Sequence, residues 1–130
     1  MSTGPVDTIQ RLLDAFNRGD FAALDVLDAQ AEIQDETRIP DAGWNYGHQG
    51  AIDWAVKLWE SFGRLSFEIS NPVTAGDCVV VHWRAAGRGK RSGVAVDMDG
   101  WCMFTLHLGK IRRVEFFADR EAALEAALVR

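Results

Sequence analysis

The sequence lacks an uninterrupted apolar run of the roughly 18 residues that a membrane-spanning helix requires. Its first segment, MSTGPVDTIQRLL, also lacks the basic start and the apolar core of a secretory signal. We therefore expect a cytoplasmic protein that has no membrane partner.

Positive charge is also in short supply. The chain has 14 Lys and Arg residues against 19 Asp and Glu residues, so its net charge is −5. Nucleic acids and anionic membranes bind to cationic patches. The basic run RGKR at 88–91 lies in a Gly-rich segment that is typical of a hairpin turn. The composition therefore predicts no nucleic-acid partner.

Cysteine and histidine are rare as well. Cys78 and Cys102 form no C-x-x-C pattern and lie in apolar runs, which favours buried free thiols over a disulfide. His48, His82 and His107 are scattered and show no metal-ligand spacing. The sequence predicts no metal site and no cofactor.

The chain does contain enough apolar residues for one folded unit. Its 130 residues are 48% hydrophobic, and a chain of this length buries about two-thirds of its unfolded surface. We expect a single domain over residues 1–130. Five tryptophans are present, and this residue favours sites where a large flat apolar face meets a specific partner.

Apolar spacing near 3.6 residues predicts helices in four segments. The first helix carries the stripe Val6, Ile9, Leu12, Leu13 and Phe16 and ends at Gly19. The others are 21–28, 51–62 and a closing helix capped by Asp119. In the helix 51–62, the expected buried face is Ile52, Ala55, Val56, Trp59 and Phe62, with Trp54 and Leu58 on a neighbouring stripe.

Alternating apolar and polar residues predict five strands, at 31–37, 65–70, 78–86, 94–108 and 110–118. A loop with Trp44 and Tyr46 follows the first strand, and long loops often form pocket rims. Because helices come first and a series of antiparallel hairpins follows, the fold class is α+β. A curved antiparallel sheet wrapped on the first and third helices would leave a cone that is open at one end.

Four motifs occur in the order found in one known superfamily. They are AFNRGDFAALDVL, YGHQGAIDW, AGDCVVVHWRAAGRGKRSGVAV and GKIRRVEFFADREAALEA. The chain resembles the nuclear transport factor 2-like, or ketosteroid isomerase-like, superfamily and its SnoaL-like (polyketide cyclase-like) branch. The resemblance implies a cone-shaped, cystatin-like α+β barrel with a pocket. It also implies a homodimer through the outer sheet face, where we expect Val80, His82, Arg84, Arg113, Glu115 and Phe117.

The stretch AEIQDET places Ile33 and Asp35 on the same strand face, so Asp35 points inward. The resemblance implies that Asp35 occupies the general-base position of ketosteroid isomerase-like members. Leu12 and Cys102 fall where those enzymes have their oxyanion donors, so Tyr46 or an indole N–H would have to assist. Alternatively, Asp35 accepts hydrogen bonds from the following loop or pairs with Arg38.

Epoxide hydrolysis is not expected. The limonene epoxide hydrolase-like members use charged residues at positions that resemble Trp83, Ala85 and Phe116 here, and none of these carries a charge. The expected reaction is proton transfer next to a carbonyl, as in isomerisation or aldol-type cyclisation. The alternative is a non-catalytic ligand-binding or dimerisation module of the same fold.

The expected ligand is small, flat and hydrophobic, with a polycyclic body as one form. The walls of the pocket would be mostly aromatic, because Trp and Tyr combine an apolar body with a polar atom near the mouth of a pocket. The predicted pocket residues are Phe16, Ile33, Trp44, Trp54, Leu58, Trp83, Cys102, Phe104 and Phe116.

Overall fold

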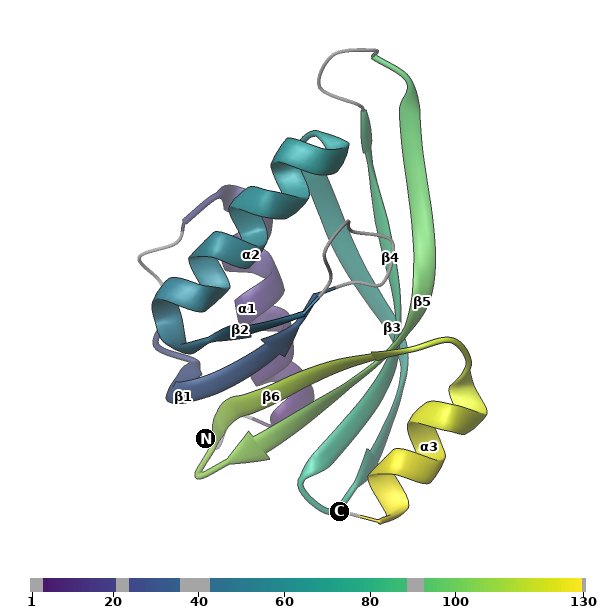
Figure 1. Ribbon diagram of the computed structural model, residues 1–130. Coiled ribbons are helices and arrows are strands. Elements are labelled where there is room, and N and C mark those ends of the chain that lie inside the picture. Colours follow the sequence, from purple (N-terminus) through teal and green to yellow (C-terminus); the bar gives the residue numbers. More distant parts are fainter. Residues whose placement is uncertain (1–3, 21–23, 36–42, 89–92, 130) are drawn as a thin grey trace.

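A curved sheet with helices on both sides forms the protein. The structure is a computed structural model and describes residues 4–20, 24–35, 43–88 and 93–129. Its helices are α1 (Pro5–Arg18), α2 (Gly47–Phe62) and α3 (Arg120–Leu128). Its strands are β1 (Leu27–Gln34), β2 (Trp44–Tyr46), β3 (Leu65–Ala75), β4 (Cys78–Arg88), β5 (Ala95–His107) and β6 (Lys110–Phe117) (Figure 1).

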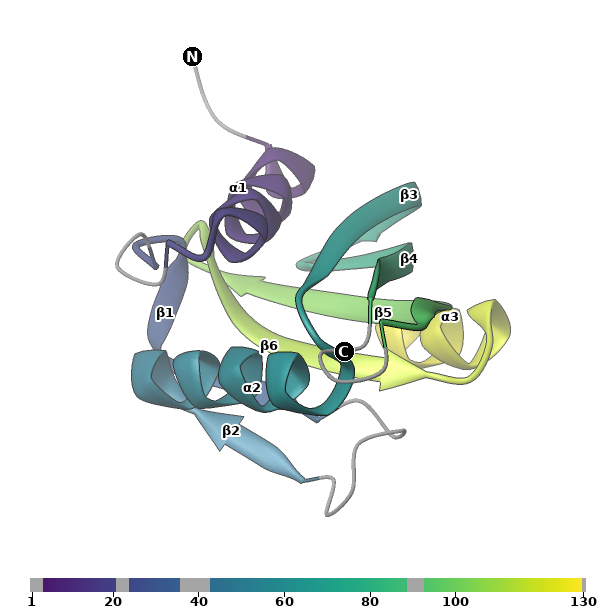
Figure 2. The same cartoon turned by 90° about the horizontal axis from the view of Figure 1, so that it is seen from above.

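The six strands form one open sheet in the order β2-β1-β6-β5-β4-β3. Strands β3 to β6 are antiparallel neighbours joined in chain order, whereas β1 pairs with β6 in parallel. Helices α1 and α2 lie on the concave side of the sheet, and α3 lies on the other side (Figure 2). The predicted α+β class with a curved sheet on two helices is confirmed. The parallel β1–β6 pair was not predicted.

The segment between α1 and β2 differs from the expectation. The end of the predicted helix at 21–28 is wrong, because Leu27 and Asp28 belong to β1. Leu27 pairs with Ile111 of β6. Residues 21–23 lie outside the described residues. The predicted long loop contains β2 and the first residues of α2, and residues 36–42 lie outside the described residues.

Helix α1 begins with Pro5 at its first turn and ends at Gly19, which has a left-handed φ of 72°. It buries Ile9 and Phe16, as predicted. In α2, Leu58 is buried but Val56 is 40% exposed, so the predicted face is rotated toward Ala51 and Ala55. The rotation lets α2 pack its small residues against the sheet.

The two sheet faces have different cores. On β4, Val79, Val81 and Trp83 face α1 and α2, whereas Val80 belongs to a second cluster with α3. Cys78 belongs to the α3 side and Cys102 to the concave side, and both are buried free thiols. The prediction of free thiols is confirmed, because the sheet separates them.

Helix α3 starts where the sequence predicts. The carboxylate of Asp119 accepts a hydrogen bond from the backbone N–H of Ala122 at 2.8 Å, which satisfies one of the free donors of the first turn. Small residues of α3, Ala123 and Ala127, are buried against Val80 and Met103 on the convex side of the sheet. One part of the outer sheet face is therefore covered within the chain itself.

Candidate functional site

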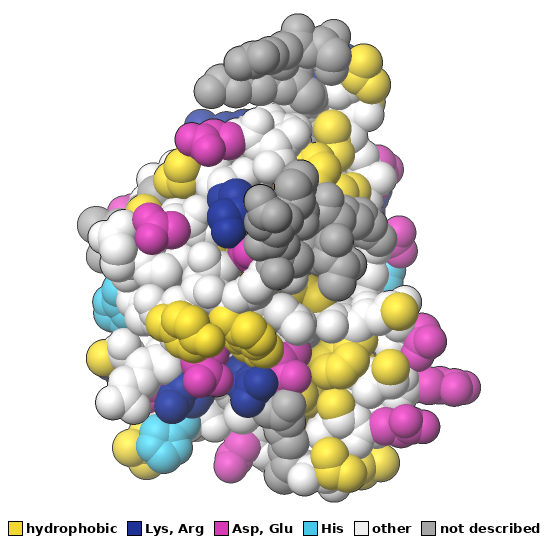
Figure 3. All heavy atoms as spheres, viewed as in Figure 1, with side chains coloured by type: hydrophobic (Ala, Val, Ile, Leu, Met, Phe, Trp, Pro, Cys, Tyr) yellow, Lys and Arg dark blue, Asp and Glu magenta, His cyan; other side chains and the backbone are white. Residues whose placement is uncertain are grey.

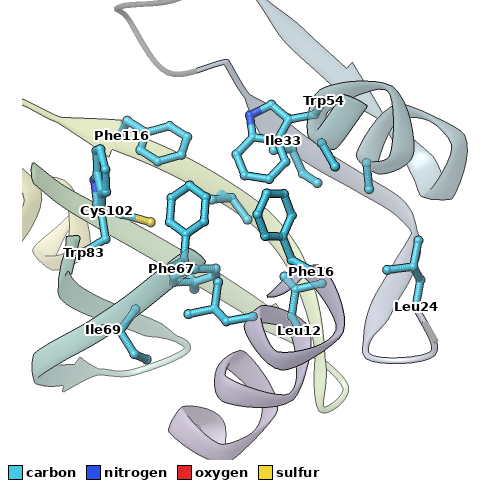
Figure 4. Close-up of a pocket in the computed structure, with 15 residues that line it drawn as sticks. Leu12, Phe16, Leu24, Ile33, Trp54, Phe67, Ile69, Trp83, Cys102 and Phe116 are labelled. Carbon is cyan, nitrogen blue, oxygen red and sulfur yellow. The ribbon is translucent and has the colours of Figure 1, made fainter. Parts of the chain in front are cut away.

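An apolar cavity lies between the concave side of the sheet and the two helices α1 and α2 (Figure 4). Its volume is about 60 Å³. Leu12 and Ile69 on its wall are half-buried, so the cavity is not sealed. Its lining residues are Leu12, Leu13, Phe16, Leu24, Ile33, Ala51, Trp54, Ala55, Phe67, Ile69, Trp83, Cys102, Phe104, Val114 and Phe116.

Six of the fifteen side chains that line the cavity are aromatic, and several of their rings pack against one another. Phe16 and Phe67 meet edge to face with ring centroids 5.0 Å apart, and Trp83 meets Phe116 in the same way at 6.0 Å. Trp54 and Phe116 are nearly parallel, with centroids 6.4 Å apart. Aromatic pairs at these distances and angles are mutually attractive. Each of these rings is therefore held in place by packing against its neighbours.

Polar atoms are scarce in this wall and none of them is a strong acceptor. Among the described residues that line the cavity, none carries a side-chain oxygen. The polar side-chain atoms are the indole nitrogens of Trp54 and Trp83 and the thiol of Cys102. Burial raises the pKa of the Cys102 thiol, and the carboxylate of Glu115 adds to the rise, so the thiol stays protonated. The surface of the cavity is therefore almost wholly apolar, and the few polar side-chain atoms of its lining residues are donors rather than strong acceptors.

Gly100 sets the position of the Trp83 ring. The two residues face each other across β4 and β5. A Cβ atom at position 100 would lie only 3.0 Å from Nε1 of Trp83, so any larger residue would push the indole. The glycine lets the indole lie flat against the sheet as one wall of the cavity.

Asp35 is buried beside the cavity, but it is not part of the lining. Only 2% of it is exposed, and it lies on the same face of β1 as the lining residue Ile33. One carboxylate oxygen accepts from Nδ2 of Asn45 at 2.6 Å. The other accepts from the backbone N–H of Gly43 at 3.1 Å and from Nζ of Lys57 at 3.0 Å. Both oxygens of this buried carboxylate are therefore hydrogen-bonded, one of them to a cation.

The contacts of Asp35 include one that the sequence alternatives named. Gly43 belongs to the segment after β1, as in the alternative in which the following loop donates to Asp35. The cation is Lys57 from α2. Arg38, the other named partner, lies outside the described residues.

The structure brings most of the predicted pocket residues together around the cavity. These are Phe16, Ile33, Trp54, Trp83, Cys102, Phe104 and Phe116. Leu58 is placed elsewhere, as a fully buried core residue of α2. Several lining residues were not named, and the signal for them was the same alternation or helical stripe: Leu12 and Leu13 on α1, and Phe67 and Ile69 on β3.

Trp44 and Tyr46 lie on the opposite side of the sheet edge. Asn45, between them, points inward to Asp35, so its two neighbours point outward. Tyr46 is 64% exposed, and the ring of Trp44 packs under the guanidinium of Arg113, 4.6 Å from its carbon. Figure 3 shows hydrophobic side chains over β2 beside charged ones. Neither residue is among those that line the cavity, and the hydrogen bonds described for Asp35 come from Gly43, Asn45 and Lys57.

Outside the cavity, the described residues show no grouping that points to metal chemistry. Among the described residues, no group of His, Cys, Asp and Glu is arranged to hold a metal ion. The described helices are all too short or too polar to cross a membrane. Nε2 of His48 lies 3.0 Å from the carbonyl oxygen of Leu27, so this histidine ties the start of α2 to β1.

Comparison with known proteins identifies a family. A family model for the SnoaL-like domain matches residues 9–114. None of the curated proteins matches the chain.

Several solved structures share the fold over nearly the whole chain. A proposed SnoaL-like polyketide cyclase from Jannaschia sp. CCS1 is 24% identical, with 100% of this chain and 99% of that chain covered and a TM-score of 0.72. IdmH, a proposed polyketide cyclase from Streptomyces antibioticus, is 23% identical, with 98% and 100% covered and a TM-score of 0.74. An NTF2-like protein of unknown function from Burkholderia pseudomallei K96243 is 14% identical, with 95% and 97% covered and a TM-score of 0.76. Identities this low show a common fold.

The Asp35–Lys57 pair predicts a measurable loss of stability. In Lys57→Met, the apolar stem of the side chain is kept but the buried carboxylate loses its cation. We expect unfolding to become easier by about 1–3 kcal/mol, less than for a fully buried pair because Lys57 is 39% exposed. Urea unfolding followed by circular dichroism measures this difference.

The matched control is Lys110→Met, since Lys110 is exposed at the start of β6. This variant should stay within about 0.5 kcal/mol of the parent chain. Equal stabilities of the two variants would show that Lys57 does not stabilise the Asp35 carboxylate.

Proposed function

The chain belongs to the SnoaL-like domain family, and from that premise we propose that it binds a small hydrophobic molecule in the cavity between the sheet and the helices α1 and α2. The carrying observation is the lining, in which every side chain is apolar or aromatic apart from the Cys102 thiol and two indole nitrogens. An open apolar space of this kind is the usual form of a ligand site. Its occupation by a ligand removes apolar surface from water on both partners.

The size of the cavity supports a compact ligand. A cavity needs a volume of about 10–15 Å³ to hold one water molecule, so this cavity of about 60 Å³ is larger than a single water requires. A ligand made of flat rings fits best, because the aromatic side chains of the wall present flat surfaces that are tilted relative to one another. A polycyclic ligand would extend past the half-buried side chains of Leu12 and Ile69 toward the surface.

A second proposal concerns catalysis. Proton transfer next to a carbonyl, by isomerisation or aldol-type cyclisation, is favoured by one observation: Asp35 is buried directly after the strand that lines the cavity with Ile33. Against it stand the three hydrogen bonds that occupy the carboxylate. Asp35 would have to leave Lys57 before it could accept a proton. We therefore place binding before catalysis.

Binding is tested with two uncharged aromatic probes, acetophenone and α-methylstyrene. We expect both to bind saturably to the parent chain, as followed by tryptophan fluorescence or calorimetry. Ala55→Leu should weaken both about tenfold or more, because Ala55 is 2% exposed and lines the cavity, so the added carbons occupy the ligand's space.

The control for this variant is Val56→Leu, on the same helix but 40% exposed and outside the lining. It should bind both probes as the parent does. If neither probe saturates the parent chain, or if Ala55→Leu binds as well as the parent, the cavity is not the ligand site.

Catalysis is tested with Asp35→Asn. Conversion of cyclohex-3-enone into its conjugated isomer serves as the probe reaction, followed by ultraviolet absorbance. If Asp35 is the base, the asparagine variant should lose about 100-fold or more of the rate while it retains affinity for acetophenone. An unchanged rate excludes Asp35 as the base, and no acceleration by the parent chain leaves binding alone as the proposal.

We also propose that the chain is a homodimer that uses the outer face of the sheet and that it works in the cytoplasm. Trp101 and Phe117 are half-buried on that face beside the ion pairs His82–Asp99 and Arg84–Asp97, and buried free thiols suit a reducing compartment. Light scattering should give twice the 14.4 kDa chain mass, and a monomer mass at all concentrations would exclude the dimer.

A further inference from the structure

The indole nitrogen of Trp54 is a buried donor that has no hydrogen-bond acceptor in the described part of the chain. Trp54 belongs to α2 and lines the cavity. Its ring reaches from α2 toward Phe116, and the two rings are nearly parallel (Figure 4). Its neighbours around the cavity are rings and aliphatic side chains.

An unpaired buried N–H is costly. Leaving such a donor unsatisfied costs about 1–3 kcal/mol, so native proteins rarely do it without a reason. The face of Phe116 does not satisfy this donor. The two rings are only 20° from parallel, so the N–H, which lies in the indole plane, cannot point at the Phe116 face.

Water is a poor partner at this position. A buried water molecule is held by two to four polar groups, typically about three. The described residues of the lining offer donors and no side-chain oxygen. A water that accepted from Trp54 would leave its own two hydrogens without partners in the wall. The donor therefore suits a molecule that accepts one hydrogen bond and needs no acceptor in return.

We infer that Trp54 Nε1 donates a hydrogen bond to a neutral carbonyl oxygen on the bound molecule, whose remaining surface is apolar. This assignment rests on the proposed ligand binding and adds the chemistry of the ligand to it. Trp54 is then the residue that fixes the orientation of the ligand. The ring of Phe116, parallel to the indole, provides a flat surface beside the anchored group.

Other polar groups fit the site less well. A hydroxyl group would bring a donor for which the described lining has no side-chain oxygen, so its proton would be buried without such a partner. A carboxylate would need a cation, and the described lining contains none. The nearby ammonium of Lys57 already pairs with Asp35 at 3.0 Å. A carbonyl avoids both costs.

The test compares the two probes in Trp54→Phe. Acetophenone and α-methylstyrene have nearly the same shape, but only the ketone can accept a hydrogen bond. The measured ratio is the affinity for acetophenone divided by the affinity for α-methylstyrene. We expect this ratio to fall about five- to tenfold in Trp54→Phe, because the ketone loses one net hydrogen bond. Each affinity is measured by calorimetry, and the ratio cancels general effects on the cavity.

The matched control is Trp59→Phe. Trp59 lies on the same helix, but it packs against Phe16 and under Arg64 and does not line the cavity. The affinity ratio should not change in this variant. An equal change in the two variants would overturn the inference, because the effect would then be indirect.

A second measurement does not require a stable variant. Each of the five tryptophans gives one indole N–H signal in a proton–nitrogen correlation spectrum. Saturation with acetophenone should move the Trp54 signal downfield, and saturation with α-methylstyrene should not. Each indole signal is assigned by its loss in the corresponding Trp→Phe variant. If Trp54→Phe does not fold, the Trp54 signal is the one that remains after the other four signals have been assigned.

The outcomes separate the two levels of the argument. Binding of both probes with an unchanged ratio in Trp54→Phe, or no ketone-specific shift, overturns the role of Trp54 and leaves ligand binding in place. Absence of saturable binding of either probe overturns the proposed function and this inference together.

Discussion

The parallel pairing of β1 with β6 is the constraint on which the site depends. It sets Ile33 beside Val114 and so brings the first strand against the far end of the antiparallel series. The pair is extended at its end by a side chain, since Oε1 of Gln34 accepts from the backbone N–H of Phe116 at 2.8 Å. Helix α2 packs mainly on β1, so this pair also places α2 over the concave side.

The cavity is a consequence of filling that concave side with rings. Protein interiors normally reach the density of organic crystals because flexible side chains adapt to the remaining gaps. Phe16, Phe67, Trp83 and Phe116 have few rotatable bonds, and each is fixed by contact with another ring. Because Gly100 has no Cβ, the indole of Trp83 can pack closely against β5. The space is therefore held open by the fold itself, as a preformed site requires.

The sequence predicted those parts of the structure that depend on local periodicity. Of the strand residues predicted for the pocket, Trp83, Cys102 and Phe116 pack in the core on the concave side of the sheet. The strand β2 was not predicted, because three residues carry too little periodicity. The helix expected at 21–28 does not extend to Leu27, because β1 begins there and the pairing of Leu27 with β6 outweighs local helix preference.

The surroundings of Asp35 show the same limit at a single residue. Alternation on β1 predicted that this side chain points inward, and only 2% of it is exposed. Its partners could not be predicted, since Lys57 is 22 residues away on another element and Asn45 comes from the unpredicted strand. Sequence patterns give the direction of a side chain, whereas its partners depend on how distant elements pack.

The separation of Asp35 from the cavity has a chemical consequence. The charged groups lie together beside the cavity, where the carboxylate of Asp35 accepts hydrogen bonds from the ammonium of Lys57 and the amide of Asn45. The surface of the cavity itself is almost wholly apolar, with the thiol of Cys102 kept neutral by burial. Trp54 and Lys57 are three residues apart on α2, so one helix borders both the charged groups and the cavity. Binding of an uncharged ligand would therefore leave the ion pair of Asp35 and Lys57 intact, whereas a reaction at Asp35 would require this pair to open first.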